Sequence, residues 1–226
     1  MWVETFDIDG LRLDAADCID KEFFKQLKVY TQGLKKDFWL MGEIIHGDYK
    51  MWANPDMMHS VTNYECWKGI YSSHNDKNYF EIAHSLRRQF AKGGIYENLR
   101  LYNFLDNHDV NRIASLLKNP ADLENAYTML FCMPGIPSVY YGSEWGITGK
   151  RSKTSDEALR PEVCLSDIKR RLKKRKRPSG IRSWKSILRH LPDSDRRPMH
   201  WFTVNMPIFW FAMNSLCLSD SIIRKR

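Results

Sequence analysis

The sequence predicts an α/β fold in which short parallel strands alternate with amphipathic helices. Apolar segments of strand length recur along the first part of the chain, separated by stretches with the three- and four-residue spacing of helices. Strands that are joined through a helix pair in parallel, with a right-handed crossover. Several of these strands also end on an acidic residue, and the carboxyl ends of parallel strands are where such folds build their sites.

The front of the chain predicts three strands and one helix. The first strand covers residues 8–14, and Asp20 can cap the helix that follows, which ends near Gly33. Further strands are predicted at residues 38–45 and, shorter, at residues 60–64. The apolar face of the helix is predicted to consist of Phe23, Phe24, Leu27 and Tyr30.

The next part of the chain predicts two helices and two strands. Asn75 or Asp76 is expected to begin a helix that stops at a pair of glycines. A strand at residues 100–105, a helix from Pro120 and a last strand at residues 136–142 follow. The apolar face of the first of these helices is predicted to consist of Phe80, Ala83, Leu86 and Phe90.

The strands number five, whereas a closed barrel of alternating strands and helices needs eight, usually over about 250 residues. The predicted fold class is therefore α/β, an incomplete (β/α)8 (TIM) barrel, followed by an irregular basic tail. The division that we predict is a partial barrel at residues 1–164 and a tail at residues 165–226 that is disordered or non-native.

The tail carries the positive charge of the chain. Residues 1–160 hold 19 lysines and arginines against 22 acidic residues, whereas residues 161–226 hold 16 against 5, so the net charge of +8 belongs to the tail. The cationic run at residues 169–177 could attract phosphate groups. It comes with neither a recognition helix nor interleaved aromatic residues, so the sequence predicts a solvated segment and no nucleic-acid partner.

The cysteines and the apolar segments exclude several classes of protein. Five cysteines are scattered without CxxC spacing, which argues against a disulfide framework and a zinc site and favours buried free thiols in a reducing compartment. No signal peptide opens the chain, and the longest apolar stretches are too short or are broken by proline and glycine. The sequence therefore predicts a cytoplasmic protein with no membrane partner.

Three acidic residues, Asp14, Glu43 and Asp109, stand where predicted strands end. On the first strand, the period of two places Arg12 and Asp14 on one face and leucines on the other. Charged side chains inside a covered sheet are costly unless they are paired or used. Paired carboxyl groups at the carboxyl ends of parallel strands are what the cleavage of glycosidic bonds requires. The order and placement of all three favour a site over isolated caps or solvated charges.

Four segments around these residues resemble glycoside hydrolase family 13, the α-amylase family. They are similar to the family's segments at barrel strands four, five, seven and eight, and they read DGLRLDAA (residues 9–16), GE (residues 42–43), FLDNHD (residues 104–109) and GIPSVYYGSE (residues 135–144). All four occur in the family's order. The resemblance implies that the chain holds strands four to eight of the catalytic barrel. Because no segment resembles strands one to three, we expect an incomplete coding sequence and an inactive fragment.

The resemblance implies a role for each site residue. Asp14 would be the nucleophile, Glu43 the general acid/base, and Asp109 the group that stabilises the transition state. Arg12 would hold and charge-tune the nucleophile, and His108 would hydrogen-bond the sugar. A cation two residues from Asp14, on the same strand face, also favours the ionised carboxylate. The implied activity is retaining hydrolysis of α-1,4-glucosidic bonds in starch-like glucans or maltooligosaccharides.

The chain also departs from the family's pattern. The strand-three motif and the inserted domain that carries structural calcium in many members have no counterpart, so the sequence predicts no metal site, and it predicts no cofactor. Asp17 and Cys18 stand where many α-amylases have Lys-His after the nucleophile segment, which alters the expected contacts to the reducing end of the sugar.

Other functions stay open. A branching or cyclising transglycosylase uses the same carboxyl groups, and a non-catalytic remnant would expose two sheet edges, which predicts self-association. His46 and His74 could line the mouth of a cleft, although an exposed loop is the commoner setting for such histidines. Trp52, Trp67 and Trp145 could stack on glucose rings, although core packing is the expected use of at least two of them.

Overall fold

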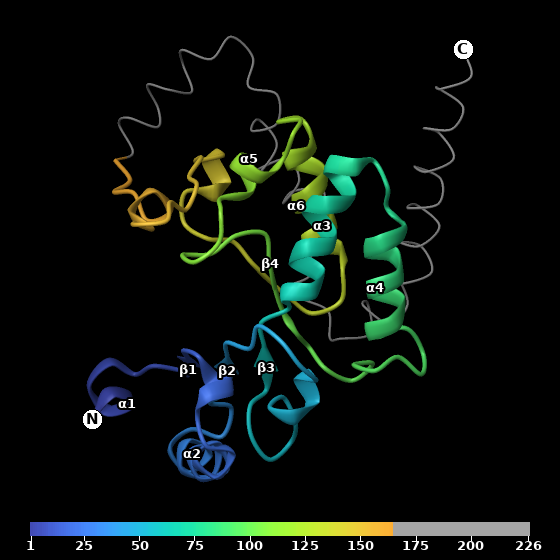
Figure 1. The fold of residues 1–226 in the computed structure, drawn as a ribbon. Coiled ribbons are helices and arrows are strands. Elements are labelled where there is room, and N and C mark those ends of the chain that lie inside the picture. The colour runs from blue at the N-terminus through green and yellow to red at the C-terminus, as the bar shows by residue number, and fades with distance from the viewer. Residues whose placement is uncertain (165–226) are drawn as a thin grey trace, which may run out of the picture.

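The computed structural model describes residues 1–164 (Figure 1). The predicted tail, residues 165–226, lies outside the described residues, and its separation from the barrel segment stays a prediction. In chain order the elements are α1 (Trp2–Phe6), β1 (Gly10–Leu13), η1 (Ala16–Cys18), α2 (Lys21–Leu34), β2 (Trp39–Gly42), η2 (Tyr49–Met51), β3 (Ser60–Val61), α3 (Tyr64–Asp76), α4 (Phe80–Phe90), β4 (Tyr102–Phe104), α5 (Ile113–Leu116), α6 (Asp122–Cys132), β5 (Ile136–Ser138), η3 (Ser143–Trp145) and η4 (Glu157–Leu159).

The strands form two small parallel sheets. β1 pairs with β2 in a register that places Leu13 opposite Gly42, and β2 pairs with β3. β4 pairs with β5, and a single parallel bridge between Thr62 and Tyr102 links the two sheets. The predicted parallel pairing is confirmed, and each strand lies beside the next one along the chain, as in a barrel.

Helix α2 begins where the sequence predicts. The side chain of Asp20 accepts a hydrogen bond from the backbone N–H of Glu22 at 2.7 Å, as expected of an N-cap. The predicted apolar face is wrong in part, because Phe23 and Tyr30 are exposed. The buried stripe consists of Phe24, Lys28 and Thr31, spaced four and three residues apart, and it leaves Phe23 and Tyr30 on the outer side of the helix. Within residues 1–164, no helix is long and apolar enough to cross a bilayer.

The predicted helix start at Asn75 or Asp76 is wrong. Those residues end α3, a helix that sequence reasoning missed because it read residues 60–64 as one strand. The signal was present, since the Asn63 side chain accepts a hydrogen bond from the N–H of Cys66 at 3.2 Å and so caps α3. Phe80 begins α4 but is 73% exposed, and the buried face of α4 runs through Ile82, Leu86 and Phe90 instead.

The other predicted strands exist but are shorter than expected. The last one ends at Ser138, not at residue 142, and the chain turns further on, at Gly142, whose φ is 83°. The N–H of Ser143 donates to the carbonyl of Tyr140 at 3.0 Å, which closes the turn. This turn brings the segment after β5 back toward the end of β4.

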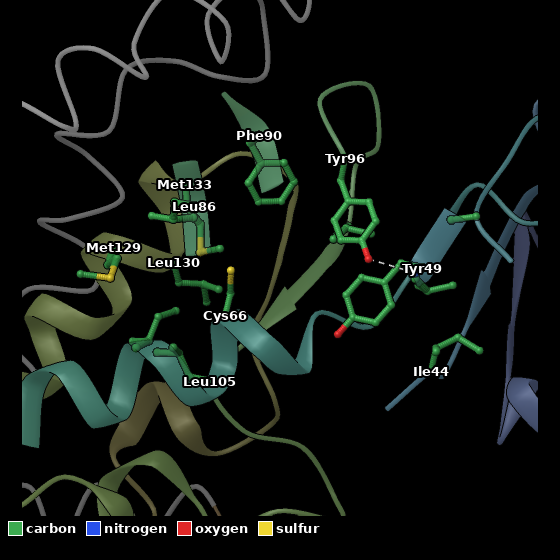
Figure 2. Packing of buried hydrophobic residues seen from close by; sticks show 14 of the residues in the cluster. Ile44, Tyr49, Cys66, Leu86, Phe90, Tyr96, Leu105, Met129, Leu130 and Met133 are labelled. Carbon is green, nitrogen blue, oxygen red and sulfur yellow. Dashed lines mark hydrogen bonds between the residues drawn. The ribbon is translucent and has the colours of Figure 1, made fainter. Parts of the chain in front are cut away.

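The main apolar core lies between the helices that follow β3 and the strands β4 and β5. Figure 2 shows Cys66 of α3, Leu86 of α4 and Leu130 of α6 among the buried side chains. Figure 2 also shows Tyr49 and Tyr96, whose rings stack with centroids 5.3 Å apart while the N–H of Tyr49 donates to the Tyr96 hydroxyl at 3.1 Å. This contact ties the loop after β2 to the loop after α4.

Buried polar contacts hold the two sheets in place. Asn63 Nδ2 donates to Gln89 Oε1 at 3.0 Å and to Asn103 Oδ1 at 2.9 Å. Asn103 in turn donates to the carbonyl of Pro134 at 2.8 Å. Because these groups come from α4, β4 and the segments before α3 and β5, the end of β3 and the middle of β4 are held together by a buried polar network.

The described cysteines differ in environment. Cys66 is a buried thiol, as predicted, and burial raises its pKa well above the ordinary value. Cys18 is exposed and Cys132 is half-buried, so the expectation of buried thiols holds only in part. Cys217 lies outside the described residues.

Candidate active site

The strand ends position the first two predicted site carboxyl groups. Asp14 directly follows β1 and Glu43 directly follows β2, and these strands are parallel neighbours. Their side chains therefore emerge at one edge of the sheet. The two carboxyl groups differ in environment, because the Asp14 side chain is 75% exposed and that of Glu43 only 8%.

Arg12 lies between these carboxyl groups. Its Nη1 is 2.5 Å from Oδ1 of Asp14, and its Nη2 is 2.8 Å from Oε2 of Glu43. The hydrogen bond and the charge of Arg12 hold the pKa of Asp14 below its usual value, with smaller lowering contributions from Glu43 and His108. The predicted placement of Arg12 beside Asp14 on one strand face thus agrees with the geometry.

Tyr64, the first residue of α3, is a site neighbour that sequence reasoning missed. Its hydroxyl donates to Oε1 of Glu43 at 3.0 Å and accepts from Nδ2 of Asn107 at 3.1 Å. Burial raises the pKa of the Tyr64 hydroxyl far above the ordinary value, so Tyr64 remains a neutral donor at physiological pH. The N-cap residue Asn63 and the following tyrosine marked the start of α3. Nothing in the local sequence indicated that this tyrosine contacts Glu43.

The loop after β4 carries the other two predicted residues. His108 Nε2 lies 3.0 Å from Oδ2 of Asp109, so the imidazole and the carboxylate form a pair. Asn107 Oδ1 accepts from the N–H of Asp109 at 2.8 Å, which turns the loop back on itself. Through Tyr64, Asn107 connects this pair to Glu43. All five predicted residues are therefore linked to one another by contacts around one end of the two sheets.

Arg160 contacts the carboxyl oxygen of Asp109 that His108 does not contact. Its Nη2 lies 3.5 Å from Oδ1 of Asp109 and 2.6 Å from Oδ2 of Asp156, and its Nε donates to the carbonyl of His108 at 3.4 Å. The segment after β5 thus returns to contact the loop after β4 that carries His108 and Asp109. Nothing in the local pattern around Arg160 indicated this contact.

A cavity of about 620 Å³ adjoins the site on the Tyr64 side. Its lining includes Tyr64, Trp67, Tyr96 and His46. Trp67 also donates its indole N–H to the carbonyl of Leu105 at 3.0 Å. The same residue therefore contacts the end of β4 and lines the cavity. The suggestion that His74 lines a cleft is wrong, because His74 is buried in α3, where Nδ1 lies 2.7 Å from the carbonyl of Ile70.

Among the described residues, no three or more His, Cys, Asp and Glu side chains are grouped so that they could hold a metal ion. The polar groups around the site are instead carboxyl groups, a guanidinium, an imidazole, an amide and a phenol. Such a set can transfer a proton, supply a carboxylate nucleophile and bind hydroxyl groups.

Comparison with known proteins decides the family. A model described as "Alpha amylase, catalytic domain" matches residues 1–217. The chain belongs to the α-amylase family, glycoside hydrolase family 13. This α-amylase family chain is 30% identical over 152 residues to the "Intracellular maltogenic amylase" of Bacillus subtilis strain 168. The match covers 66% of this chain and 26% of that protein. It is also 30% identical over 166 residues to the "Alpha-amylase" of Saccharomycopsis fibuligera, covering 70% of the chain and 32% of that protein.

Solved structures of the family have the same fold. The cyclic α-maltosyl-(1→6)-maltose hydrolase of Arthrobacter globiformis matches with a TM-score of 0.64 and 25% identity, covering 84% of this chain and 42% of that one. An Anoxybacillus α-amylase matches with a TM-score of 0.61 and 29% identity, covering 74% and 39%. The described residues are therefore part of a (β/α)8 barrel fold, in which the strands here form only small sheets. The chain spans about a quarter to a third of the length of the two curated relatives described.

Proposed function

We propose that this chain is the catalytic part of an α-amylase-type glycosidase that hydrolyses α-1,4-glucosidic bonds with retention of configuration. The observation that carries the proposal is the position of the Arg12 guanidinium between the carboxyl groups of Asp14 and Glu43. A retaining glycosidase needs two carboxyl groups about 5–5.5 Å apart. One guanidinium can contact two carboxyl groups at once only when both are near each other, so this contact supports the pairing.

In this proposal, Asp14 attacks the anomeric carbon while Glu43 gives its proton to the departing glycosidic oxygen. The bond between Asp14 and the sugar is then broken by a water molecule that Glu43 deprotonates. The lowered pKa of Asp14 supports its role, because a nucleophile must be ionised at the working pH. The low exposure of Glu43 supports the other role, because a shielded carboxyl group exchanges its proton with the substrate and not with bulk water.

Asp109 and His108 are proposed to serve the transition state. Positive charge develops on the sugar ring as the bond breaks, and a third carboxylate stabilises that charge. The contact of His108 with Asp109 orients the imidazole, which is proposed to hydrogen-bond a sugar hydroxyl.

The proposed substrates are starch-like α-glucans or maltooligosaccharides. The names of the relatives, a maltogenic amylase and a hydrolase of a cyclic maltose dimer, support this class. The cavity beside Tyr64 lies within the volume range of sugar-sized ligand sites and has aromatic walls that can pack against sugar rings. An intracellular setting, as in the name of the Bacillus subtilis relative, is part of the proposal.

Two alternatives remain distinct from hydrolysis. A transglycosylase would use the same carboxyl groups and pass the sugar to another glucan. A non-catalytic remnant is favoured by one observation, the outer edge of β1, which pairs with no other strand among the described residues.

The test is chromatography of the products that the full chain forms from maltoheptaose. Shorter sugars alone support hydrolysis, longer sugars as well support transfer, and no products support the remnant. If products form, against the expectation of an inactive fragment, Asp14→Asn and Glu43→Gln are expected to abolish their formation, whereas the control Asp37→Asn, an exposed acid outside the site, is expected to leave it unchanged. Turnover that survives Asp14→Asn would refute the proposed nucleophile.

A further inference from the structure

The loop that carries His108 and Asp109 is anchored at both ends by buried charged side chains. We call residues 107–111 the site loop. Asp106, just before it, is 2% exposed, and Arg112, just after it, is fully buried, whereas the residues of the site loop are half-buried. Charged side chains are rarely buried unless they have polar partners, so both Asp106 and Arg112 are expected to make specific contacts.

One hydroxyl group joins the two anchors. Ser143 Oγ, in the segment after β5, donates to the carboxylate of Asp106, with both oxygens at 2.8 Å. The same oxygen accepts from Nη1 of Arg112 at 3.0 Å. We call Asp106, Arg112 and Ser143 the anchor cluster.

Arg112 also contacts the segments that follow β5. Its Nη1 donates to the carbonyl of Tyr141 at 2.7 Å, and its Nε donates to the carbonyl of Leu159 at 3.0 Å. Its guanidinium also lies over the ring of Tyr140, 4.0 Å from the centroid. The far end of the site loop is therefore held by two segments that follow β5.

Backbone N–H groups at the far end of the site loop are also hydrogen-bonded. The N–H of Ile113 donates to Oδ2 of Asp106 at 2.8 Å, so the carboxylate at one end of the loop binds the chain just past the other end. The N–H of Arg112 donates to the carbonyl of Gly149 at 3.0 Å. Asp106 thereby links the two ends of the site loop directly.

The charges of the cluster depend on one another. Burial raises the pKa of Asp106, whereas the Ile113 N–H, the Ser143 hydroxyl and the charge of Arg112 oppose that rise. Ser143 is a hydrogen-bond partner of both buried charges, so its removal takes one partner from each of them, which costs more than losing a contact at the surface. The three side chains therefore join both ends of the site loop to the segment after β5.

We propose that the anchor cluster positions the site loop for the glycosidase reaction, an inference that rests on the function proposed above. None of the three members reaches the substrate in this proposal; each acts through the loop. The loop begins with Asn107, which donates to the hydroxyl of Tyr64, and Tyr64 donates to Glu43. A displaced loop therefore moves His108 and Asp109 and also loosens the donor on Glu43.

Amide hydrogen exchange of the full chain tests the proposal. Ser143→Ala removes the shared hydroxyl, and Ser143→Thr keeps it. We expect Ser143→Ala to speed exchange in the site loop by about tenfold or more while exchange in α2 changes by less than about twofold. Ser143→Thr should restore slow exchange. Ser73→Ala, which truncates a buried serine of α3, is the matched control and should leave the site loop unchanged.

A binding measurement completes the test. Titration with maltotriose should show weaker affinity for Ser143→Ala than for Ser143→Thr. If Ser143→Ala does not fold, Asp106→Asn, which preserves the shape of the side chain, is expected to give the same local acceleration. Unchanged loop exchange, or equal acceleration in the loop and in α2, overturns the proposal. Local loosening in a chain that binds no maltotriose even when unaltered supports the anchor and refutes the glycosidase function.

Discussion

The hydroxyl of Tyr64 donates to Oε1 of Glu43 at 3.0 Å, and both side chains are buried. Glu43 follows β2, whereas Tyr64 opens α3 after β3, so the contact spans two neighbouring βα units. The phenol also accepts a hydrogen bond from Asn107, which places it between the proposed acid and the loop of the third carboxylate. Tyr64 therefore connects the strand ends of the two sheets, in addition to the contact between Asn63 and Asn103.

Replacing Tyr64 with phenylalanine is expected to destabilise the fold. The change leaves a buried carboxyl oxygen and a half-buried amide without their partner, at a cost of about 1–3 kcal/mol in the free energy of unfolding. Urea denaturation followed by tryptophan fluorescence measures this loss. Tyr71→Phe, on the same helix and also packed against Trp67, is the control. Equal stability of the two variants would contradict the contact, and any glucan turnover should fall in Tyr64→Phe alone.

Removing the Arg12 side chain is expected to raise the pKa of Asp14. Arg12 holds this pKa below 3.8, the ordinary value, so the stability that the pair contributes is present above about pH 4 and is lost as the pH falls through the lower folded pKa. In Arg12→Ala the Asp14 carboxyl should titrate closer to 3.8 in a carbon-detected NMR titration. Lys25→Ala, which breaks the exposed pair with Glu22, is the control and should not move Asp14. An unchanged Asp14 midpoint in Arg12→Ala would show that the guanidinium does not tune it.

Two glycine substitutions are expected to have opposite effects. Gly135, just before β5, has a φ of 121°, and an added Cβ would lie 2.5 Å from the carbonyl oxygen of Leu101. Gly135→Ala should therefore lower the free energy of unfolding by about 1–3 kcal/mol. Gly33, near the end of α2, has open space around it, so Gly33→Ala should raise the free energy of unfolding by about 0.5–1 kcal/mol. Thermal and urea unfolding of both variants would check the signs, and a stabilised Gly135→Ala would contradict the close approach of β4 and β5.

The chain is expected to self-associate through the edge of β1. Within residues 1–164 this edge pairs with no other strand, and the neighbouring α1 exposes Trp2 and Phe6. Sedimentation velocity should show species larger than the monomer that grow with concentration. The double change Trp2→Ser with Phe6→Ser should reduce them, whereas Phe80→Ser, an equally exposed position on α4, should not. A chain that sediments as a monomer at all concentrations would contradict the predicted self-association.

Local features of the sequence predicted the five strands and most of the helices, because such features depend on neighbouring residues; α3 was missed. The period of two placed Arg12 beside Asp14, and Asp20 capped α2 as expected. The same reasoning failed for Phe80 and Tyr30, which fit a helical spacing but face solvent. A helical spacing describes several overlapping stripes, and only the elements packed against the helix decide which stripe is buried.

The sequence by itself determined that acids stand at the ends of parallel strands and that the chain has the α/β pattern of its family. Only the tertiary structure decided that Arg12 contacts both Asp14 and Glu43, that Tyr64 donates to Glu43, and that Ser143 joins the two ends of the site loop. The physical reason is that most of these partners lie far apart in the sequence. The side chains of α3 and of the segment after β5 reach the strand ends only because the parallel strands bring successive units of the chain to one edge of the fold.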